Sequence, residues 1–362
     1  MIRVLVADDS ILYRKTLKDI LSAVEGVEVI DTAVNGADAL EKIVRLKPDL
    51  VTLDVEMPEM DGLEVLRRLK QQRSESAVIM CSSLTSAGAA TTIEALNQGA
   101  FDFIAKPDGP DRIRNAEEIR LQIKTRLAYF VARQKLRAIT AGTAPAAPVR
   151  PAQAAAIQAI PAEPARIAQK MEIVALGIST GGPAALNRII PLLPGNLRVP
   201  VVVVIHMPPV FTATFAGSLG AKSRIRVIEA TEGQAIEPGT VYIAPGARQM
   251  KVARHEVTGR TVLRLTDDPP ENFCKPSADY LFRSVAGAFG ARALGVIMTG
   301  MGADGVQGLK KMKQAGARVL AQDEKTCVVF GMPMEAIKAG VVDEVLPLEK
   351  IPERIAWLAG LG

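Results

Sequence analysis

The sequence is poor in the residues that build several common kinds of site. Its three cysteines lie far apart among 362 residues and form no CxxC pair, which argues against a disulfide framework and a cysteine-rich zinc site and favours a reducing cytoplasm. Aromatic residues make up only 4%, which argues against a platform for stacking nucleic-acid bases. Because no apolar run reaches the length of a signal-peptide core or a bilayer span, we expect a soluble, cytoplasmic protein without membrane insertion.

The charge excess is also small. A net charge of +5 and a pI near 9.1 suit a nucleic-acid partner, but the positive residues are spread thinly and form no basic recognition helix, so we expect no such partner. The content of 48% hydrophobic and 23% charged residues is typical of a globular protein. Since 362 residues exceed the size of a single core, the length predicts two domains.

Residues 1–126 alternate short apolar runs with amphipathic stretches. Five runs read as strands, each followed by a helical pattern, at residues 2–7, 27–33, 48–54, 76–81 and 101–106. This alternation predicts a doubly wound parallel α/β sheet. Ser10 is placed to cap the first helix, and a helix from Asp111 to about Lys135 leads out of the domain.

The following residues, 127–169, continue that helix and then become a linker rich in proline and alanine. A second strand–helix alternation fills residues 170–362, with strands predicted at 171–179, 199–206, 293–300 and 317–323. It predicts a second α/β domain with a mainly parallel sheet. A hairpin is expected between residues 225 and 265, where the runs 239–246 and 255–265 include a Thr258–Gly259 turn.

Charged residues mark three strand ends in the first domain. Asp8 and Asp9 end the first predicted strand, Asp54 ends the third and Lys106 ends the fifth. Parallel strands bring these ends to one edge of the sheet, where such folds bind ligands. Clustered carboxylates favour Mg²⁺, and we expect Asp9 and Asp54 to bind it directly and Asp8 to bind directly or through water.

Asp54 stands alone at its strand end and is the predicted acceptor of a phosphoryl group, whose charge Lys106 neutralises. Ser82 or Ser83, after the fourth strand, offers a hydroxyl that reorients toward the phosphate. Taken singly, Asp8 and Asp9 are better explained as helix caps and Lys106 as a solvated loop cation. Their joint placement favours the phosphoacceptor site.

The first domain closely resembles a response-regulator receiver domain. The resemblance lies in the strings VADDS, LDVEMPEMDG and IAKP and in the position of Ser82. It implies a flavodoxin-like fold and phosphotransfer from a chemotaxis histidine kinase to Asp54.

Only two histidines can serve as a general base in the second domain. His206 directly follows an apolar strand, whereas His255 lies in the predicted hairpin and reads as a solvated turn residue. Ser179 ends another strand in the string GISTG, which fits a nucleophile elbow. A glycine turn that binds an anion at a helix N-terminus is an equally good interpretation of that string alone.

Asp304 follows a third apolar strand and is placed to orient His206. Asp267 and Asp268 are rival acids, but they precede two prolines in a long loop. The order Ser, His, Asp differs from the order in α/β-hydrolases, which argues against a generic esterase. The candidates for the oxyanion hole are the backbone N–H groups of four residues: Thr180, Gly181, Gly182 and Met301. We expect no cofactor at this site.

The second domain is similar to the catalytic domain of CheB-type chemotaxis methylesterases. The shared strings are GISTGGP, HMPPVFT, YIAPG, PPENFCKPSAD, MTGMGADG and VVFGMP. The resemblance implies a Rossmann-like domain that demethylates glutamate methyl esters, and deamidates glutamines, on methyl-accepting chemotaxis receptors under phosphorylation control. It places the nucleophile on Ser179, the base on His206 and the orienting acid on Asp304. Ile178 and Ala303 depart from common family strings, which have Ala and Asn there.

Overall fold

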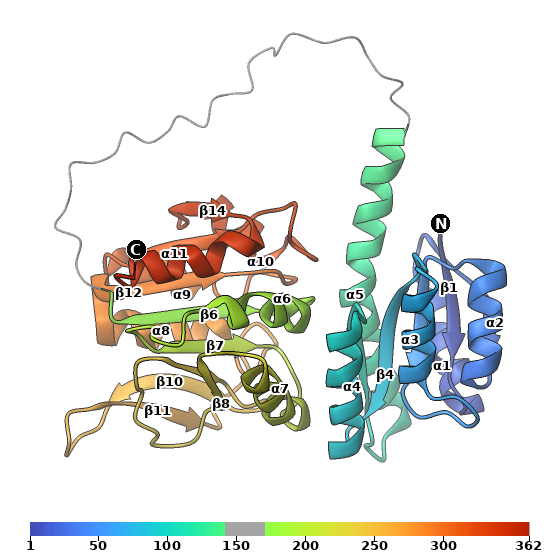
Figure 1. The fold of residues 1–362 in the computed structure, drawn as a ribbon, viewed down its shortest axis with the longest axis horizontal. Coiled ribbons are helices and arrows are strands. Elements are labelled where there is room, and N and C mark those ends of the chain that lie inside the picture. Colours follow the sequence, from blue (N-terminus) through green and yellow to red (C-terminus); the bar gives the residue numbers. More distant parts are fainter. Residues whose placement is uncertain (142–170, 362) are drawn as a thin grey trace, which may run out of the picture.

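The computed structural model describes residues 1–141 and 171–361. It contains two α/β domains, drawn blue to green and green to red in Figure 1. Most of the predicted linker, residues 142–169, lies outside the described residues, and residues 127–141 belong to a helix that ends at Ala141, beyond the predicted end near Lys135. Within the described ranges, no helix combines the length and the apolar content that a membrane crossing requires.

The first domain is a five-stranded sheet in the order β2-β1-β3-β4-β5, and all of its strand pairs are parallel. The prediction of a doubly wound sheet is confirmed. The elements are β1 (Ile2–Ala7), α1 (Ile11–Ser22), β2 (Val27–Ala33), α2 (Gly36–Leu46), β3 (Leu50–Asp54), α3 (Gly62–Gln71), β4 (Ala77–Ser83), α4 (Ser86–Gln98), β5 (Asp102–Lys106) and α5 (Arg112–Ala141).

Alternation along the strands explains how helices cover both faces of this sheet. In β1, Leu5 packs in an apolar cluster with α2, α3 and α4, while Val4 and Val6 pack in another with α1 and α5. Ser10 caps α1, as predicted, by accepting a hydrogen bond from the backbone N–H of Tyr13 at 3.4 Å. Successive side chains of a strand point to opposite faces, so each face acquires its own core.

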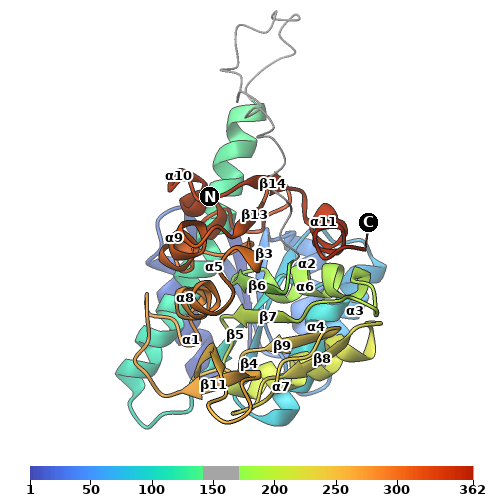
Figure 2. The ribbon, with the colours of Figure 1, turned by 90° about the vertical axis from the view of Figure 1, so that its left-hand side faces the viewer.

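The second domain has a seven-stranded sheet in the order β14-β13-β12-β6-β7-β9-β8, again with parallel pairs throughout. In Figure 2 the labels of β14, β13, β6, β7, β9 and β8 follow this order. Its strands are β6 (Ile173–Ile178), β7 (Val201–Ile205), β8 (Arg226–Glu229), β9 (Thr240–Ile243), β12 (Ala293–Ile297), β13 (Arg318–Gln322) and β14 (Glu344–Leu346). Its helices are α6 (Gly182–Ile189), α7 (Pro209–Ala221), α8 (Ala278–Phe289), α9 (Val306–Gln314), α10 (Met332–Lys338) and α11 (Ile351–Leu358), with short 3₁₀ turns at Ile190–Leu192, Gly290–Arg292 and Leu348–Lys350.

The predicted hairpin is only partly correct. The run 255–265 does belong to a hairpin. It contains the turn between two antiparallel strands, β10 (Gln249–Arg254) and β11 (Thr261–Thr266), and most of the second strand. The run 239–246, however, forms β9, which lies inside the parallel sheet between β7 and β8. All four residues of β9 are buried, and a strand covered on both faces reads as a continuous apolar run whether its neighbours are parallel or not.

The two domains pack against each other through α4 and α7, which lie side by side in Figure 1. Phe103 of β5 stacks on Phe211 of α7 with ring centroids 4.4 Å apart. The amide Nδ2 of Asn97 donates a hydrogen bond to Ser218 Oγ at 3.1 Å. One apolar cluster runs across this contact, so the receiver-like domain rests on a helix that begins just after His206.

Candidate active sites

The acidic residues predicted from the first domain lie at one edge of its sheet. The ammonium group of Lys106 is 2.8 Å from Asp8 Oδ2 and 2.7 Å from Asp54 Oδ2. Asp8 and Asp54 are buried, Asp9 is exposed, and one oxygen from each of the three carboxylates lies within 4.8 Å of the others. Sheet register brings these side chains together from segments far apart in sequence.

The electrostatics of this pocket fit a divalent cation. Burial and the neighbouring carboxylate of Asp8 raise the pKa of Asp54 to about 6, although Lys106 opposes the shift. For Lys106, burial disfavours the charge, but Asp54 and Asp8 outweigh it and raise its pKa. Three carboxylates with one side open to water are the oxygen donors that Mg²⁺ prefers, so the residues present fit that ion.

Two further side chains surround the acidic pocket. Ser82 is buried at the end of β4, where its hydroxyl donates to the Ser83 carbonyl at 3.2 Å. Tyr13, which the sequence did not single out, places its ring 4.7 Å from Lys106 Nζ and donates its hydroxyl to the Pro107 carbonyl at 3.1 Å. Tyr13 therefore helps to fix the lysine that faces Asp54.

In the second domain, Ser179 lies in a tight turn between β6 and α6. Gly181 has a φ of 74°, and a Cβ there would lie 2.4 Å from Val328 Cβ, so the turn requires glycine. Ser179 N–H donates to the Thr299 carbonyl at 2.9 Å. A Cβ on Gly300 would lie 2.8 Å from Ser179 Cβ. The turn after β12 thus closes against the serine.

His206 and Asp304 are brought together directly. His206 follows β7, and its Nε2 lies 2.9 Å from Asp304 Oδ2. Burial disfavours the charge on Asp304, but hydrogen bonds from His206, Ser277 and the Ala278 N–H lower its pKa to about 2. An ionised carboxylate accepts only, so Nε2 carries the proton and Nδ1 is left as the basic nitrogen.

A network of donors fixes the Asp304 carboxylate. Asp304 Oδ1 accepts from Ser277 Oγ at 2.6 Å, from the Asp279 N–H at 3.2 Å and from Asn272 Nδ2 at 3.2 Å. Oδ2 accepts from the Ala278 N–H at 2.7 Å. The start of α8 and the loop before it therefore hold the acid, and the acid holds the imidazole.

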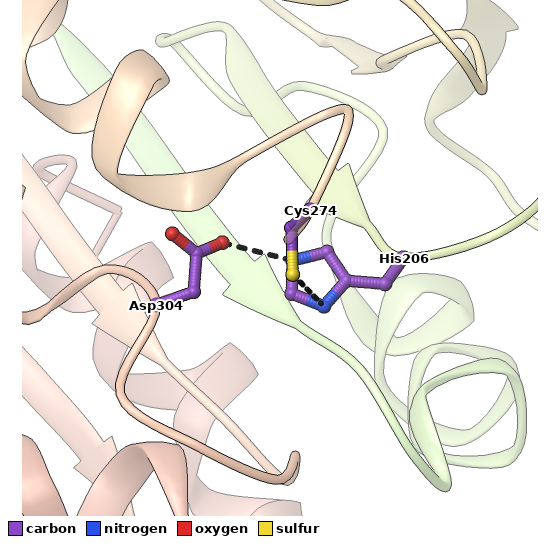
Figure 3. A group of neighbouring side chains, drawn as sticks. All are labelled: His206, Cys274 and Asp304. Carbon is purple, nitrogen blue, oxygen red and sulfur yellow. Dashed lines mark hydrogen bonds and ion pairs between the residues drawn. The ribbon is translucent and has the colours of Figure 1, made fainter. Parts of the chain in front are cut away.

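The other ring nitrogen faces Cys274, not the serine. Cys274 Sγ is 3.6 Å from His206 Nδ1, so Figure 3 shows interactions at two different ring nitrogens. Burial lowers the pKa of His206, but the hydrogen bonds with Asp304 and Cys274 outweigh it and raise the pKa to about 10. Among the described residues, no hydrogen bond joins the Ser179 hydroxyl to His206. Catalytic hydrogen bonds often form only with substrate bound.

The four candidates for the oxyanion hole differ in structure. The Gly182 N–H already donates to the Ser179 carbonyl at 2.6 Å. Within the described part of the chain, the N–H groups of Thr180, Gly181 and Met301 donate to no protein acceptor. These three remain able to stabilise an oxyanion.

The rival residues lie elsewhere. Asp267 pairs with Arg248, with Oδ1 3.0 Å from the guanidinium Nε, and Asp268 accepts from the Tyr280 hydroxyl. His255 Nδ1 accepts from the Thr258 N–H at 3.3 Å in the turn between β10 and β11. None of these three contacts the His206–Asp304 pair in the described residues.

Comparison with known proteins covers both domains. Residues 4–118 match the response regulator receiver domain, and residues 174–355 match the CheB methylesterase domain. The protein-glutamate methylesterase/protein-glutamine glutaminase of Desulfotalea psychrophila is 47% identical over 98% of this chain and 97% of its own length. The protein of the same name from a Nocardioides species is 43% identical over 99% of this chain and 96% of its own length. The chain belongs to the CheB methylesterase family.

A solved CheB methylesterase structure supports the same assignment. The catalytic domain of Thermotoga maritima CheB methylesterase is 42% identical, with a TM-score of 0.51, and the match covers 52% of this chain and 99% of that one. The sequence analysis did not single out three residues that contact the His206–Asp304 pair: Asn272, Cys274 and Ser277. All three lie within the string PPENFCKPSAD. The one sequence signal for them is a polar loop that ends in a serine placed to cap a helix.

Proposed function

We propose that the chain is a phosphorylation-activated hydrolase of the cytoplasm that demethylates glutamate methyl esters on methyl-accepting chemotaxis receptors and deamidates specific receptor glutamines. The observation that carries the proposal is the hydrogen bond between His206 and an ionised Asp304, beside a serine on a tight glycine turn. Relatives similar over nearly their whole length bear the name of both activities. The His–Asp pair supplies the base, and the names supply the substrate class.

In the first half of the reaction, His206 Nδ1 takes the hydroxyl proton of Ser179 while Oγ attacks the γ-carbonyl of the glutamate ester. The tetrahedral intermediate collapses, the imidazolium returns the proton, and methanol leaves. Water then attacks the glutamyl–serine ester with His206 again as base, which releases the glutamate carboxylate and restores Ser179. With a glutamine, ammonia leaves in place of methanol.

The intermediate carries its negative charge on the former carbonyl oxygen. We assign its stabilisation to the backbone N–H groups of Thr180, Gly181 and Met301, which have no protein acceptor among the described residues. Losing one such donor typically costs about 3–4 kcal/mol in the transition state. Asp304 stabilises the imidazolium that forms beside it.

In the receiver domain, Asp54 is the phosphoacceptor for a chemotaxis histidine kinase. Asp9 and Asp54 would hold Mg²⁺ directly, and Asp8 directly or through water. When bound, the ion neutralises charge on the phosphoryl oxygens. Lys106, already 2.7 Å from Asp54, pairs with the phosphoryl group once it forms.

Phosphorylation controls the hydrolase through the contact between α4 and α7. Ser82 lies at the end of β4, directly before α4, and Phe103 in β5 stacks on Phe211 in α7. A rearrangement of Ser82 and Lys106 toward a phosphoryl group therefore acts on α4 and β5, both of which touch the second domain. We expect phosphorylation to loosen this contact and shift the population toward an active arrangement.

The test is methanol release from a methylated receptor fragment, with and without a small phosphodonor. We expect Ser179→Ala to abolish release, because no nucleophile remains. The matched control is Ser223→Ala, just after α7, which should stay close to wild type. Substantial activity in Ser179→Ala would refute the nucleophile, and no methanol from phosphorylated wild type would refute the substrate.

A further inference from the structure

We propose that His206 and Cys274 form a Zn²⁺ site whose occupancy switches the hydrolase off. His206, Cys274 and Asp304 each offer a metal-ligating atom within 4.8 Å of the others. The mechanism above uses the histidine and the aspartate but gives the cysteine no part. The binding of zinc stands on geometry alone, whereas the inhibition rests on the proposed role of His206 as the base.

The separation of the two donor atoms matches a tetrahedral zinc centre. Zn–N and Zn–S bonds of about 2.05 and 2.3 Å at a tetrahedral angle put nitrogen and sulfur about 3.6 Å apart. His206 Nδ1 and Cys274 Sγ are 3.6 Å apart. The ion therefore fits between them without a change in their spacing.

Asp304 serves this site from the outer shell. It holds the Nε2 side of the ring at 2.9 Å, opposite the nitrogen that faces the sulfur (Figure 3). A carboxylate that accepts from the far nitrogen of a metal-binding imidazole fixes its tautomer and orientation. The four donors to Asp304 keep that carboxylate in place.

The donor set selects the metal. One imidazole nitrogen and one thiolate suit Zn²⁺, while Mg²⁺ prefers the oxygen-only carboxylates of the receiver domain. Solvent can reach both ligands, because His206 and Cys274 are only partly buried and the neighbouring Phe273 is fully exposed. Water completes the coordination.

Binding converts the Cys274 thiol, whose S–H donates a hydrogen bond to the Asn272 carbonyl at 3.4 Å, to a thiolate and releases its proton. At neutral pH it also displaces the proton that the His206 imidazolium carries on Nδ1, so two protons pass to water. The Nδ1 lone pair then points at zinc and cannot take the proton of Ser179. Zinc and catalysis thus compete for the same lone pair.

Cobalt substitution in the full-length protein tests the binding. Co²⁺ bound to a thiolate gives a sulfur-to-metal charge-transfer band, which carboxylate sites do not give. We expect the band, and its loss on adding Zn²⁺, in wild type, in Ser179→Ala and in the matched cysteine control Cys327→Ala. It should vanish in Cys274→Ala and need roughly 10- to 100-fold more metal in Asp304→Asn. No band in wild type, or an unchanged band in Cys274→Ala, would overturn the site.

Two measurements on the wild-type protein avoid any dependence on the variants. Zn²⁺ should protect Cys274 from iodoacetamide, as mapped by mass spectrometry, while Cys327 stays as reactive as before. Equal alkylation of Cys274 with and without Zn²⁺ contradicts the proposal.

In the methanol assay, Zn²⁺ should inhibit methanol release at the concentration that protects Cys274 from alkylation. Protection without inhibition would retain the metal site and reject its regulatory role, and protection in a chain that releases no methanol would reject only the proposed function.

Discussion

The two sites of this chain are built in different ways. In the receiver domain, Asp8, Asp54 and Lys106 stand at the ends of three parallel strands and contact one another directly. In the hydrolase domain, strand ends supply only Ser179 and His206. The acid that completes the pair lies well beyond the end of β12 and is held by residues 272–279.

This difference shows what each kind of site depends on. Sheet register brings the charged residues of the receiver pocket together, because hydrogen bonding between neighbouring strands aligns their ends. The hydrolase site depends instead on hydrogen bonds to Asp304 from residues 272–279, which belong to the loop before α8 and to the start of that helix. Substitutions in that network should therefore damage catalysis more than their distance from the substrate suggests.

The largest effect is expected for Asp304→Asn. The amide of asparagine carries no negative charge. It therefore neither holds the His206 proton on Nε2 as firmly nor stabilises the positive charge of the imidazolium. We expect kcat to fall about 10³- to 10⁴-fold in the methanol assay. Asp268→Asn, at the rival acid, is the control and should remain near wild type. A loss of less than about tenfold in Asp304→Asn would mean that the loop network does not serve the base.

In the receiver, Asp54→Asn should remove all stimulation by a phosphodonor, because an amide cannot form the acyl phosphate. Labelled phosphate incorporation and methanol release measure the two halves of this prediction. Asp19→Asn, on the exposed side of α1, is the matched control. Continued stimulation in Asp54→Asn would place the phosphoacceptor elsewhere.

The same contrast explains what the sequence predicts. Strand-end residues such as Asp54 and His206 could be located because apolar runs are visible in the sequence and parallel strands align. The side chain of Asn272 could not, since it reaches Asp304 from a backbone with φ of 51° that no pattern indicates. Cys274 could not be singled out either, because the side chain that it contacts belongs to a histidine 68 positions away. The direction of β9 was missed because burial on both faces does not reveal which strands flank it.

A smaller effect should appear in the pH profile. As the proposed base, His206 must be neutral to take a proton. Because its pKa is raised, we expect kcat/KM to climb from neutral pH toward about pH 10. Cys274→Ala removes one of the hydrogen bonds that raise this pKa, so the climb should move to lower pH. Subtracting the rate with Ser179→Ala removes hydrolysis by hydroxide. An unmoved profile would show that Cys274 does not tune the histidine.

The smallest effect tests the contact that joins the two regions. Asn97→Ala removes the hydrogen bond to Ser218 across the α4–α7 contact, and a neutral hydrogen bond contributes about 0.5–1.5 kcal/mol. If that contact holds the hydrolase in its inactive arrangement, activity without phosphodonor should rise roughly 2- to 10-fold, while activity with phosphodonor should change less. Gln98→Ala is the matched control, because the side-chain amide of Gln98 donates to Glu94 of its own helix and, among the described residues, to nothing in the second domain. Equal activities of the two variants without phosphodonor would mean that this contact does not restrain the hydrolase. A rise in the activity of Asn97→Ala alone would show that the receiver domain acts on the hydrolase site through α7, the helix that follows His206.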